Sequence, residues 1–188
     1  MNTEKIKMQI NSNPVIAAVR TEEELSQAVS SSVKVIFLLS SSILNVEKSI
    51  NICHQNKKIV FVHFDLVSGL GSDEDAVKFI CMTGTDGIIS TKLNILKFAS
   101  EQGVFTIQRF FILDSRSCGT MRKSLSQFKP DMVEIMPGIM ISEIEKMIHE
   151  NSLDVICGGM VEDKQTVIKL LSSGAVGVST SRTTLWEL

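Results

Sequence analysis

The chain has 188 residues, of which 44% are hydrophobic and 21% are charged, and its net charge is −2. This composition is typical of a globular protein with a sizeable core and excludes a largely disordered chain. The slightly acidic total provides no general attraction to nucleic acid or to an anionic membrane surface.

The start of the chain and the cysteines bear on compartment and metal binding. The first residues, Met1-Asn-Thr-Glu-Lys-Ile6, lack the apolar centre of a signal peptide, and no apolar run approaches the roughly 18 residues of a membrane span. The four cysteines are scattered, without a C-x-x-C pair or a histidine at ligand spacing. We therefore expect a cytoplasmic protein with no membrane partner and no metal site.

The first predicted strand follows a polar N-terminal segment. Residues 1–13 are expected to be loosely structured or to form a short lid over the bottom of the fold. Val15–Val19 is a continuous apolar run, as expected for a parallel strand that is covered on both faces. Arg20 follows the strand, and Thr21 with Glu24 has the spacing of a capping box that opens a helix.

Seven further strand candidates follow, each ahead of a helix-length segment. They cover residues 33–39, 58–66, 86–91, 104–110, 132–136, 154–157 and 176–179. Eight strand–helix units in one regular series predict an α/β protein, a closed (β/α)8 TIM barrel that forms a compact single domain over residues 1–188. The chain is short for this fold, which typically takes about 250 residues, so the loops must be short. An open doubly wound sheet is the alternative, but Val19-Arg20-Thr21 lacks the glycine-rich turn that such sheets usually carry.

The last two predicted strands end in small residues. Gly158-Gly159 ends the seventh strand, and Ser179-Thr180-Ser181 ends the eighth. Two consecutive strands of a β/α barrel end in this way when their loops hold a phosphate through backbone N–H groups and hydroxyls. The alternative is that the glycine pair forms a tight turn and the hydroxyl residues form an N-cap. The first interpretation predicts a small phosphorylated ligand.

Charged residues are expected at the same rim, because functional groups of a β/α barrel gather where its strands end. Arg20 and Arg109 could donate to an anion, or each could pair with an acidic neighbour such as Glu134 or Asp65. Asp65 and Glu134 could accept hydrogen bonds from ligand hydroxyls, or act as general base and acid. His63, predicted to share a side of its strand with Asp65, is at least as well explained as a core histidine.

The catalytic inventory is small. No lysine ends a predicted strand, so a Schiff base has no candidate, and no metal-ligand set is present. We therefore predict a site that holds a ligand without transforming it, with no catalytic residues and no cofactor. The alternative is a TIM-barrel enzyme that metabolises a phosphosugar or glycerophosphate, with Asp65 or Glu134 as acid or base.

Several segments, in register along the chain, resemble one protein family. They are Phe61-Val-His-Phe-Asp-Leu-Val-Ser-Gly69, Phe79-Ile80, Gly87-Ile-Ile-Ser-Thr91, Ile107-Gln-Arg-Phe-Phe-Ile-Leu-Asp114, Lys129-Pro-Asp-Met-Val-Glu-Ile-Met-Pro-Gly138, Gly158-Gly159 and Ser179-Thr-Ser181 with Leu185-Trp186. From Pro14 to Trp186 the chain is similar to the glycerol-3-phosphate-responsive antiterminators, the regulators of glycerol uptake operons. The resemblance implies a TIM barrel that senses glycerol 3-phosphate as its effector. In its bound form it would act on leader mRNA and prevent termination, so that glycerol genes are expressed.

The resemblance also implies roles for residues at the strand ends. Those that would bind the phosphate are Gly158, Gly159, Thr180 and Ser181. Those that we assign to the glycerol end and the rim are Arg20, Asp65, Arg109 and Glu134. Glu162, close behind the glycine pair, is an acidic group that would weaken the electrostatic support for a phosphate. A phosphate-binding barrel that regulates a protein partner instead of RNA is a third hypothesis.

Overall fold

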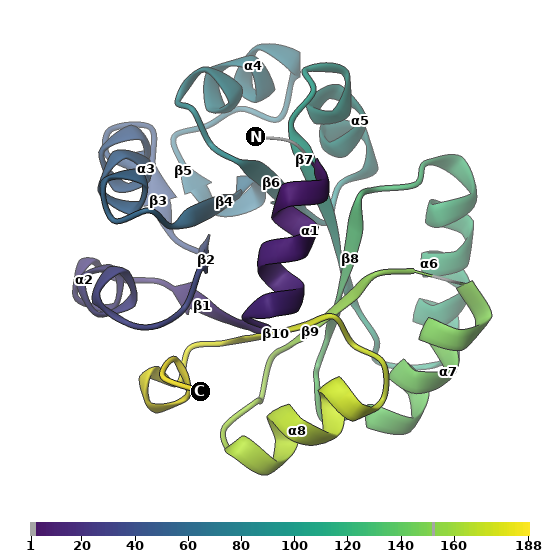
Figure 1. Ribbon diagram of the computed structural model, residues 1–188. Helices are drawn as coiled ribbons and strands as arrows, with labels where there is room; N and C mark the ends of the chain where they lie inside the picture. The colour runs from purple at the N-terminus through teal and green to yellow at the C-terminus, as the bar shows by residue number, and fades with distance from the viewer. Residues whose placement is uncertain (1–2, 152) are drawn as a thin grey trace.

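The computed structural model describes residues 3–151 and 153–188, and these form a closed barrel of eight parallel strands (Figure 1). Neighbouring strands follow the chain order around the barrel, and the last strand pairs with the first. The barrel strands are β1 (Val15–Val19), β2 (Val35–Leu38), β4 (Ile59–His63), β6 (Gly87–Ser90), β7 (Phe105–Phe111), β8 (Met132–Met136), β9 (Val155–Gly158) and β10 (Gly177–Thr180). The closed sheet confirms the predicted (β/α)8 barrel and excludes the open doubly wound sheet.

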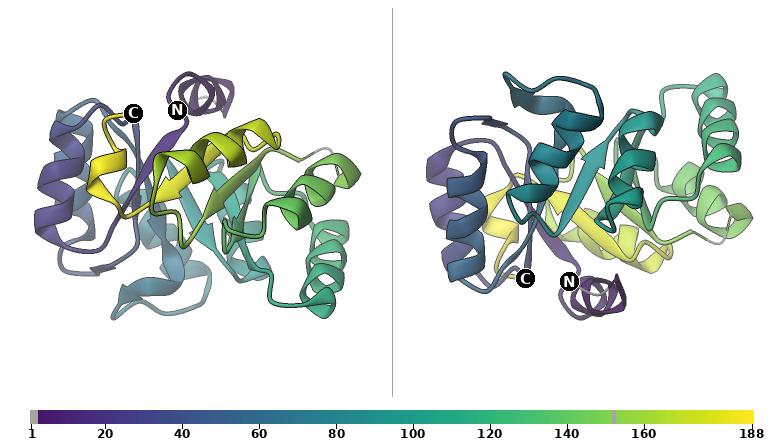
Figure 2. Two further views of the ribbon diagram at one scale, coloured as in Figure 1. Left: turned by 90° about the horizontal axis from the view of Figure 1, so that it is seen from below. Right: turned by 90° about the horizontal axis from the view of Figure 1, so that it is seen from above.

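Helices connect the strands and surround the outside of the barrel (Figure 2). They are α2 (Glu22–Ser30), α3 (Val46–Gln55), α4 (Glu74–Met82), α5 (Leu93–Glu101), α6 (Ser115–Gln127), α7 (Ile141–Asn151) and α8 (Lys164–Ser172). Thr21 caps α2 by accepting from the N–H of Glu24 at 3.2 Å, and aspartates cap α4, α6 and α8. After β10, the expected last helix is a short 3-10 turn, η2 (Thr183–Leu185).

Two hydrophobic cores fill the molecule, one inside the barrel and one between the barrel and its helices. Inside the barrel, the ring of Phe61 packs edge to face against those of Phe37 and Phe105, with 5.5 Å between centroids in each pair. A Cβ at Gly87 would overlap the ring of Phe61, so this packing requires glycine. The middle of the barrel is therefore filled by side chains, and the ends are where a ligand can bind.

Helix α1 (Thr3–Ser12) closes the end of the barrel at which the strands begin (Figure 1). Ile6 and Ile10 are fully buried in the core inside the barrel, and Ile10 lies against Gly177 at the start of β10. Residues 3–12 thus form a helical lid, the second of the two alternatives expected for residues 1–13, and this corrects the first, a loosely structured segment; residues 1 and 2 lie outside the described residues. The reason is the i, i+4 spacing of the two isoleucines, which gives a polar helix one apolar stripe to bury.

At the other end of the barrel, a two-stranded parallel sheet joins two loops. β3 (Ser41–Ser42) pairs with β5 (Val67–Ser68) beyond the ends of β2 and β4. The predicted strand over residues 58–66 ends at His63, and the 3-10 turn η1 (Phe64–Leu66) redirects the chain before β5. Asp65 consequently leaves the strand alternation that was expected to place it beside His63.

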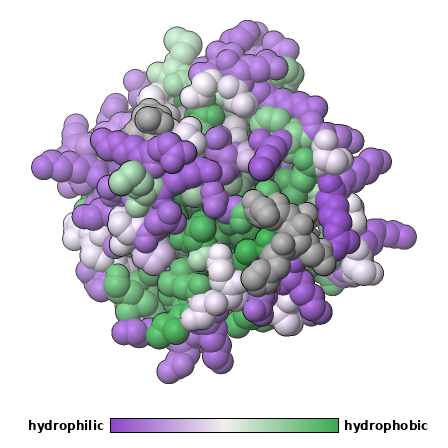
Figure 3. All heavy atoms as spheres, turned by 45° about the vertical axis from the view of Figure 1, so that its right-hand side comes forward, coloured by the Kyte–Doolittle hydropathy of each residue, from purple (hydrophilic) through white to green (hydrophobic). Residues whose placement is uncertain are grey.

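Hydrophilic residues surround a hydrophobic area on the face of the molecule shown in Figure 3. No helix in residues 3–151 and 153–188 is long and apolar enough to cross a membrane. Among the side chains that the structure describes, in residues 3–148 and 153–188, no three histidines, cysteines, aspartates or glutamates gather as a potential metal site. The candidate site is therefore sought among the other polar groups at the strand ends.

Candidate functional site

A buried hydrogen-bonded group lies near the ends of β7, β8 and β10. Glu134 of β8 is fully buried, and it accepts from Nε of Arg109 on β7 at 2.6 Å and from Oγ of Ser179 on β10 at 2.7 Å. The guanidinium compensates the charge of the carboxylate, which a buried ion requires. The sequence left two roles open for Arg109, binding an anion or pairing with an acidic neighbour, and the structure shows the pairing with Glu134. Its two terminal nitrogens have no acceptor within the described residues.

Gly158 of β9 lies beside the hydrogen bond that joins Ser179 to Glu134. A Cβ at position 158 would overlap Oγ of Ser179 and lie 2.8 Å from Oε1 of Glu134. The carbonyl groups of Gly158 and Gly159 accept from the N–H of Gly138, at 2.7 and 2.9 Å. The glycine at position 158 thus allows side chains from β8 and β10 to meet across β9.

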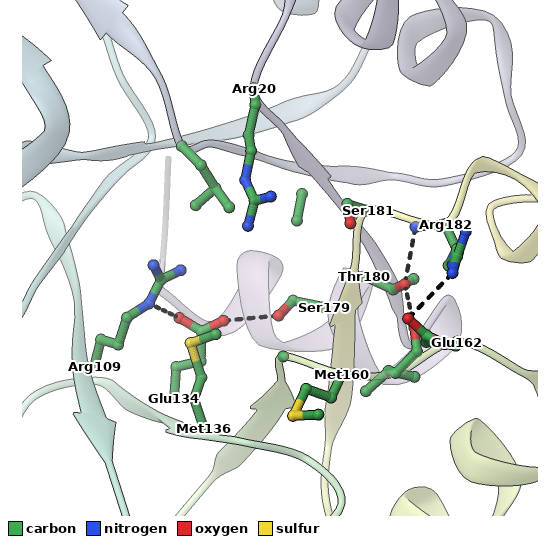
Figure 4. A pocket seen from close by; sticks show the side chains of 14 residues that line it. Arg20, Arg109, Glu134, Met136, Met160, Glu162, Ser179, Thr180, Ser181 and Arg182 are labelled. Carbon is green, nitrogen blue, oxygen red and sulfur yellow. Dashed lines mark hydrogen bonds and ion pairs between the residues drawn. The ribbon is translucent and has the colours of Figure 1, made fainter.

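These residues adjoin a pocket at the end of the barrel where the strands finish (Figure 4). Its empty volume is about 480 Å³, and arginines, hydroxyl side chains and apolar side chains line it. The lining residues are Ala18, Arg20, Leu39, Arg109, Glu134, Met136, Gly159, Met160, Val161, Glu162, Ser179, Thr180, Ser181 and Arg182. Of the eight residues predicted to bind a ligand, the pocket brings together six, and the two outside its lining are Gly158 and Asp65.

Arg20 follows β1, and its side chain extends into the pocket in Figure 4. Its backbone N–H donates to Oε2 of Glu24 at 2.6 Å, which fixes the chain where the strand ends. The guanidinium forms no ion pair or hydrogen bond with any other described residue. The sequence offered the same two roles for Arg20 and Arg109, but the structure separates them. Arg109 is buried and paired, whereas Arg20 is exposed and free to bind an anion.

The chain turns sharply after β9. Gly159 and Met160 both have positive φ angles, of 75° and 59°. The left-handed conformation costs a residue with a Cβ roughly 1–2 kcal/mol, and such strain is concentrated at functional sites. The N–H groups of Met160 and Ser181 have no acceptor within the described parts of the chain. Both are therefore available to a ligand in the pocket.

Thr180 is buried at the end of β10 and joins the two loops beside the pocket. Its Oγ1 donates to the carbonyl of Val161 at 2.8 Å and accepts from the N–H of Arg182 at 3.0 Å. Its own carbonyl accepts from Nε1 of the buried Trp186 at 2.9 Å. The Thr180 hydroxyl is thus used within the protein, whereas the exposed hydroxyl of Ser181 has no partner among the described residues.

Glu162, the acidic group near the glycine pair, is paired with Arg182 at the mouth of the pocket (Figure 4). Oε1 of Glu162 and Nη2 of Arg182 are 3.1 Å apart, and both side chains are more than half exposed. Arg182 therefore offsets the charge that was expected to weaken phosphate binding. Arg182 was not among the predicted site residues, although its position directly after Ser181 at a strand end is a usable signal.

Asp65 lies apart from the pocket and orders the chain after β6. Its Oδ1 accepts from Oγ of Ser90 at 2.8 Å. Its Oδ2 accepts from the N–H and the hydroxyl of Thr91, at 2.7 and 2.8 Å. The structure therefore does not bring Asp65 together with Arg109 and Glu134, and its carboxylate already holds three protein donors.

His63 is a buried residue at the end of β4, with 3% of its surface exposed. Its Nδ1 has no hydrogen-bond partner within the described residues. Burial, and next the positive charge of Arg109, lower the pKa of His63 to about 4. The imidazole is therefore neutral near pH 7, and it does not line the pocket, as expected for a core histidine.

The fold and the pocket define a class of protein, a TIM barrel with an arginine- and hydroxyl-lined pocket at the ends of its strands. Within this class, the chain belongs to the family of glycerol-3-phosphate-responsive antiterminators, whose family model matches residues 15–186. This membership confirms the resemblance seen in the sequence.

Two solved structures agree with this assignment, and one curated protein is similar over nearly the whole chain. The Escherichia coli (strain K12) protein YgcP is 34% identical over 180 residues, which are 95% of this chain and 94% of that protein. A glycerol uptake operon antiterminator regulatory protein of Listeria monocytogenes has a similar structure, with a TM-score of 0.89 and 29% identity over 92% of this chain and 94% of that chain. A glycerol uptake operon antiterminator-related protein of Thermotoga maritima has a TM-score of 0.85 and 31% identity over 94% of this chain and 99% of that chain. An aldolase with 13% identity and a TM-score of 0.70 shares the fold alone.

Proposed function

We propose that this chain senses glycerol 3-phosphate in the pocket and, with the ligand bound, binds leader mRNA and prevents termination ahead of glycerol-utilisation genes. Membership of a glycerol-3-phosphate-responsive antiterminator family supports both halves of the proposal. The observation that carries the ligand site is the unpaired guanidinium of Arg20, which enters a pocket next to the Arg109–Glu134 pair. Such a regulator acts in the cytoplasm, where leader mRNA is made.

The phosphate would bind between the ends of β9 and β10. The free N–H groups of Met160 and Ser181 and the free hydroxyl of Ser181 can donate to its oxygens. Gly159 allows the backbone to turn toward the pocket, and Arg20 supplies the cation. Gly158 and Thr180, the other two residues predicted to bind the phosphate, would act indirectly. Their hydrogen bonds to Gly138 and Val161 would hold the loops in place, and neighbouring residues would contact the ligand.

The glycerol end would lie over Arg109 and Glu134. The terminal nitrogens of Arg109 remain as donors for ligand hydroxyls, and each oxygen of Glu134 retains a lone pair for an incoming hydroxyl. Because the Arg109–Glu134 pair is buried and fixed, it would bind a hydroxylated carbon chain more tightly than an apolar one. Asp65 would contribute only through the loop that it holds in place.

We infer a regulator rather than an enzyme of phosphosugars or glycerophosphates. A general acid or base must take up a proton and release it again, which requires more of a carboxylate than accepting a hydrogen bond. Glu134 accepts from Arg109 and Ser179, and Asp65 accepts from Ser90 and Thr91 outside the pocket. Among the described residues that line the pocket, none is a lysine that could form a Schiff base. The proposed ligand is therefore an effector, and the site takes no catalytic residue and no cofactor.

Titration calorimetry with glycerol 3-phosphate, glycerol and inorganic phosphate tests the sensing half. We expect the strongest binding for glycerol 3-phosphate, and a loss of about tenfold or more in Arg20→Gln, because a charge-assisted hydrogen bond is removed. Arg116→Gln, at an exposed position of α6, is the matched control and should leave the affinity unchanged. Equal binding of glycerol and glycerol 3-phosphate would contradict the proposal.

A gel shift with leader RNA at defined salt, with and without glycerol 3-phosphate, tests the other half. We expect the ligand to strengthen RNA binding. If the ligand binds but RNA never does, an affinity pull-down with nuclease treatment distinguishes the alternative of a protein partner. Turnover of a phosphorylated triose or glycerol compound that disappears in Asp65→Asn or Glu134→Gln would instead support an enzyme.

A further inference from the structure

A second hollow lies at the opposite end of the barrel, beside α1. Its empty volume is about 720 Å³, and it opens among the segments that enter β2, β4 and β6. Charged side chains dominate its lining, namely Lys5, Lys34, Lys57, Lys58 and Asp86, and His54 lies among them. The ligand pocket described above lies where the strands end, so the two hollows are separated by the packed interior of the barrel.

Positive charge is in excess around this second hollow, although the chain as a whole is acidic. Lys5, Lys34 and Lys57 are exposed, and none of the three forms an ion pair within the described residues. Among the described residues that line the hollow, Asp86 is the one acidic residue, and its Oδ2 is held by His54 at 3.0 Å and by the N–H of Val60 at 2.9 Å. The lysines are therefore available to an external anion.

Lys58 fixes a further positive charge at the edge of the hollow. Its side chain is buried, and its Nζ donates to the carbonyls of Ser31 and Val33, both at 2.7 Å. Burial, and next the charge of Lys34, lower the pKa of Lys58, while Glu187 acts in the opposite direction. Lys34 and Lys58 are thus close enough to repel each other, and a bound anion would relieve that repulsion.

We propose that the lysine cluster, defined as Lys5, Lys34, Lys57 and Lys58, is the surface on which the phosphate backbone of RNA docks; this inference rests on the RNA binding proposed above. The exposed lysines come from α1 and from the loops that enter β2 and β4. Point charges spread over an open face match a chain of phosphates better than they match one compact anion.

The chemistry of this surface also predicts how RNA is bound. The chain has no tyrosine, and its one tryptophan is buried, so stacking on these rings does not contribute at the cluster. The protein would contact the phosphate backbone of the RNA. Its RNA affinity would therefore vary little with RNA sequence and strongly with salt concentration. Sequence choice would then come from the shape of the folded leader or from other parts of the surface.

The decisive variant combines Lys5→Gln, Lys34→Gln and Lys57→Gln. It removes three exposed charges and leaves the buried Lys58, with its structural bonds, in place. RNA affinity is measured by fluorescence anisotropy with glycerol 3-phosphate present, at several salt concentrations. We expect binding to weaken at least tenfold at low salt. The slope of log K against log salt should fall by about 2, since each single-strand phosphate contact contributes about 0.7.

The matched control combines Lys97→Gln, Lys123→Gln and Lys169→Gln, three exposed lysines of α5, α6 and α8. It changes the net charge by the same amount and should keep the wild-type salt slope. Both triple variants should bind glycerol 3-phosphate as the wild type does, because none of the six lysines lines the ligand pocket.

Three results would overturn the proposal, and they differ from one another. If both triple variants bind RNA as the wild type does, the cluster is not the RNA surface, although the proposed function stands. If the wild type binds glycerol 3-phosphate but shows no RNA affinity at any salt, the antitermination half of the proposed function fails as well. Binding of polyglutamate in place of RNA, lost in the cluster variant alone, would assign the surface to an acidic protein partner instead.

Discussion

Glu162 and Arg182 form an ion pair at the mouth of the ligand pocket, with 3.1 Å between Oε1 and Nη2. The guanidinium of Arg182, the residue after Ser181, thus already has a carboxylate partner within the protein. A phosphate bound beside Ser181 would have to compete with Glu162 for this cation. Since both side chains are more than half exposed, the pair itself contributes at most about 1 kcal/mol.

Replacing Glu162 with glutamine should strengthen the binding of glycerol 3-phosphate. The change frees Arg182 and removes a negative charge from the lining, so we expect an affinity increase of about two- to fivefold, with a larger effect at low salt. Titration calorimetry at two ionic strengths measures this. Glu47→Gln, an exposed acid on α3, should have no effect. Weaker binding in Glu162→Gln would show that the carboxylate contacts the ligand.

Gly158→Ala should destabilise the fold because the new Cβ meets the Ser179–Glu134 hydrogen bond. We expect a loss of about 1–3 kcal/mol in urea unfolding, as for other overpacked buried positions, together with weaker ligand binding. Gly119→Ala is the matched control. Apart from the adjacent residues and the backbone of α6 itself, no atom lies within 4 Å of a Cβ at this position, so alanine should stabilise the helix by about 0.5–1 kcal/mol. Equal stability of the two variants would argue against the close approach at position 158.

Ile6→Ala should show that α1 belongs to the folded core. Ile6 is fully buried inside the barrel, and truncating such a residue typically costs about 2–5 kcal/mol. Met8→Ala, two residues further along the same helix, is the control, because Met8 is 68% exposed and its truncation should change stability by less than about 0.5 kcal/mol. If both variants unfold at the wild-type urea concentration, α1 does not contribute to the core.

The barrel could be predicted because its signal repeats along the chain. Each strand is covered on both faces, so eight largely apolar runs stood out, and regular spacing supplied the topology. The N-terminal helix was missed because its signal consists of two buried isoleucines, Ile6 and Ile10, within a polar segment. Two isoleucines on one side of a helix indicate a buried face only when the surface that they pack against is known, and here that surface is the open end of the barrel.

The site could be predicted less completely, since its assembly depends on where strands stop. Arg20 reached the pocket because it directly follows β1, whereas Arg109 and Glu134 line it from within β7 and β8. Asp65 did not, because the chain leaves β4 at His63 and turns in η1, although its apolar pattern continues. Which arginine would be paired also depends on the neighbouring strand, since Arg109 and Glu134 are register partners on β7 and β8. A sequence read one strand at a time does not contain that register.

The buried His63 should make the stability of the protein depend on pH below neutrality. Its pKa is lowered from 6.5 to about 4 in the folded chain, so between these values the unfolded chain binds a proton that the folded chain does not. The contribution is fully present above pH 6.5 and is lost as pH falls toward 4, by about 3 kcal/mol in total at 1.4 kcal/mol per pKa unit. Urea unfolding of the wild type and His63→Gln at pH 7, 5.5 and 4.5 measures it. The variant should start less stable but lose less stability on acidification, and parallel pH curves would show that His63 is already charged in the folded protein.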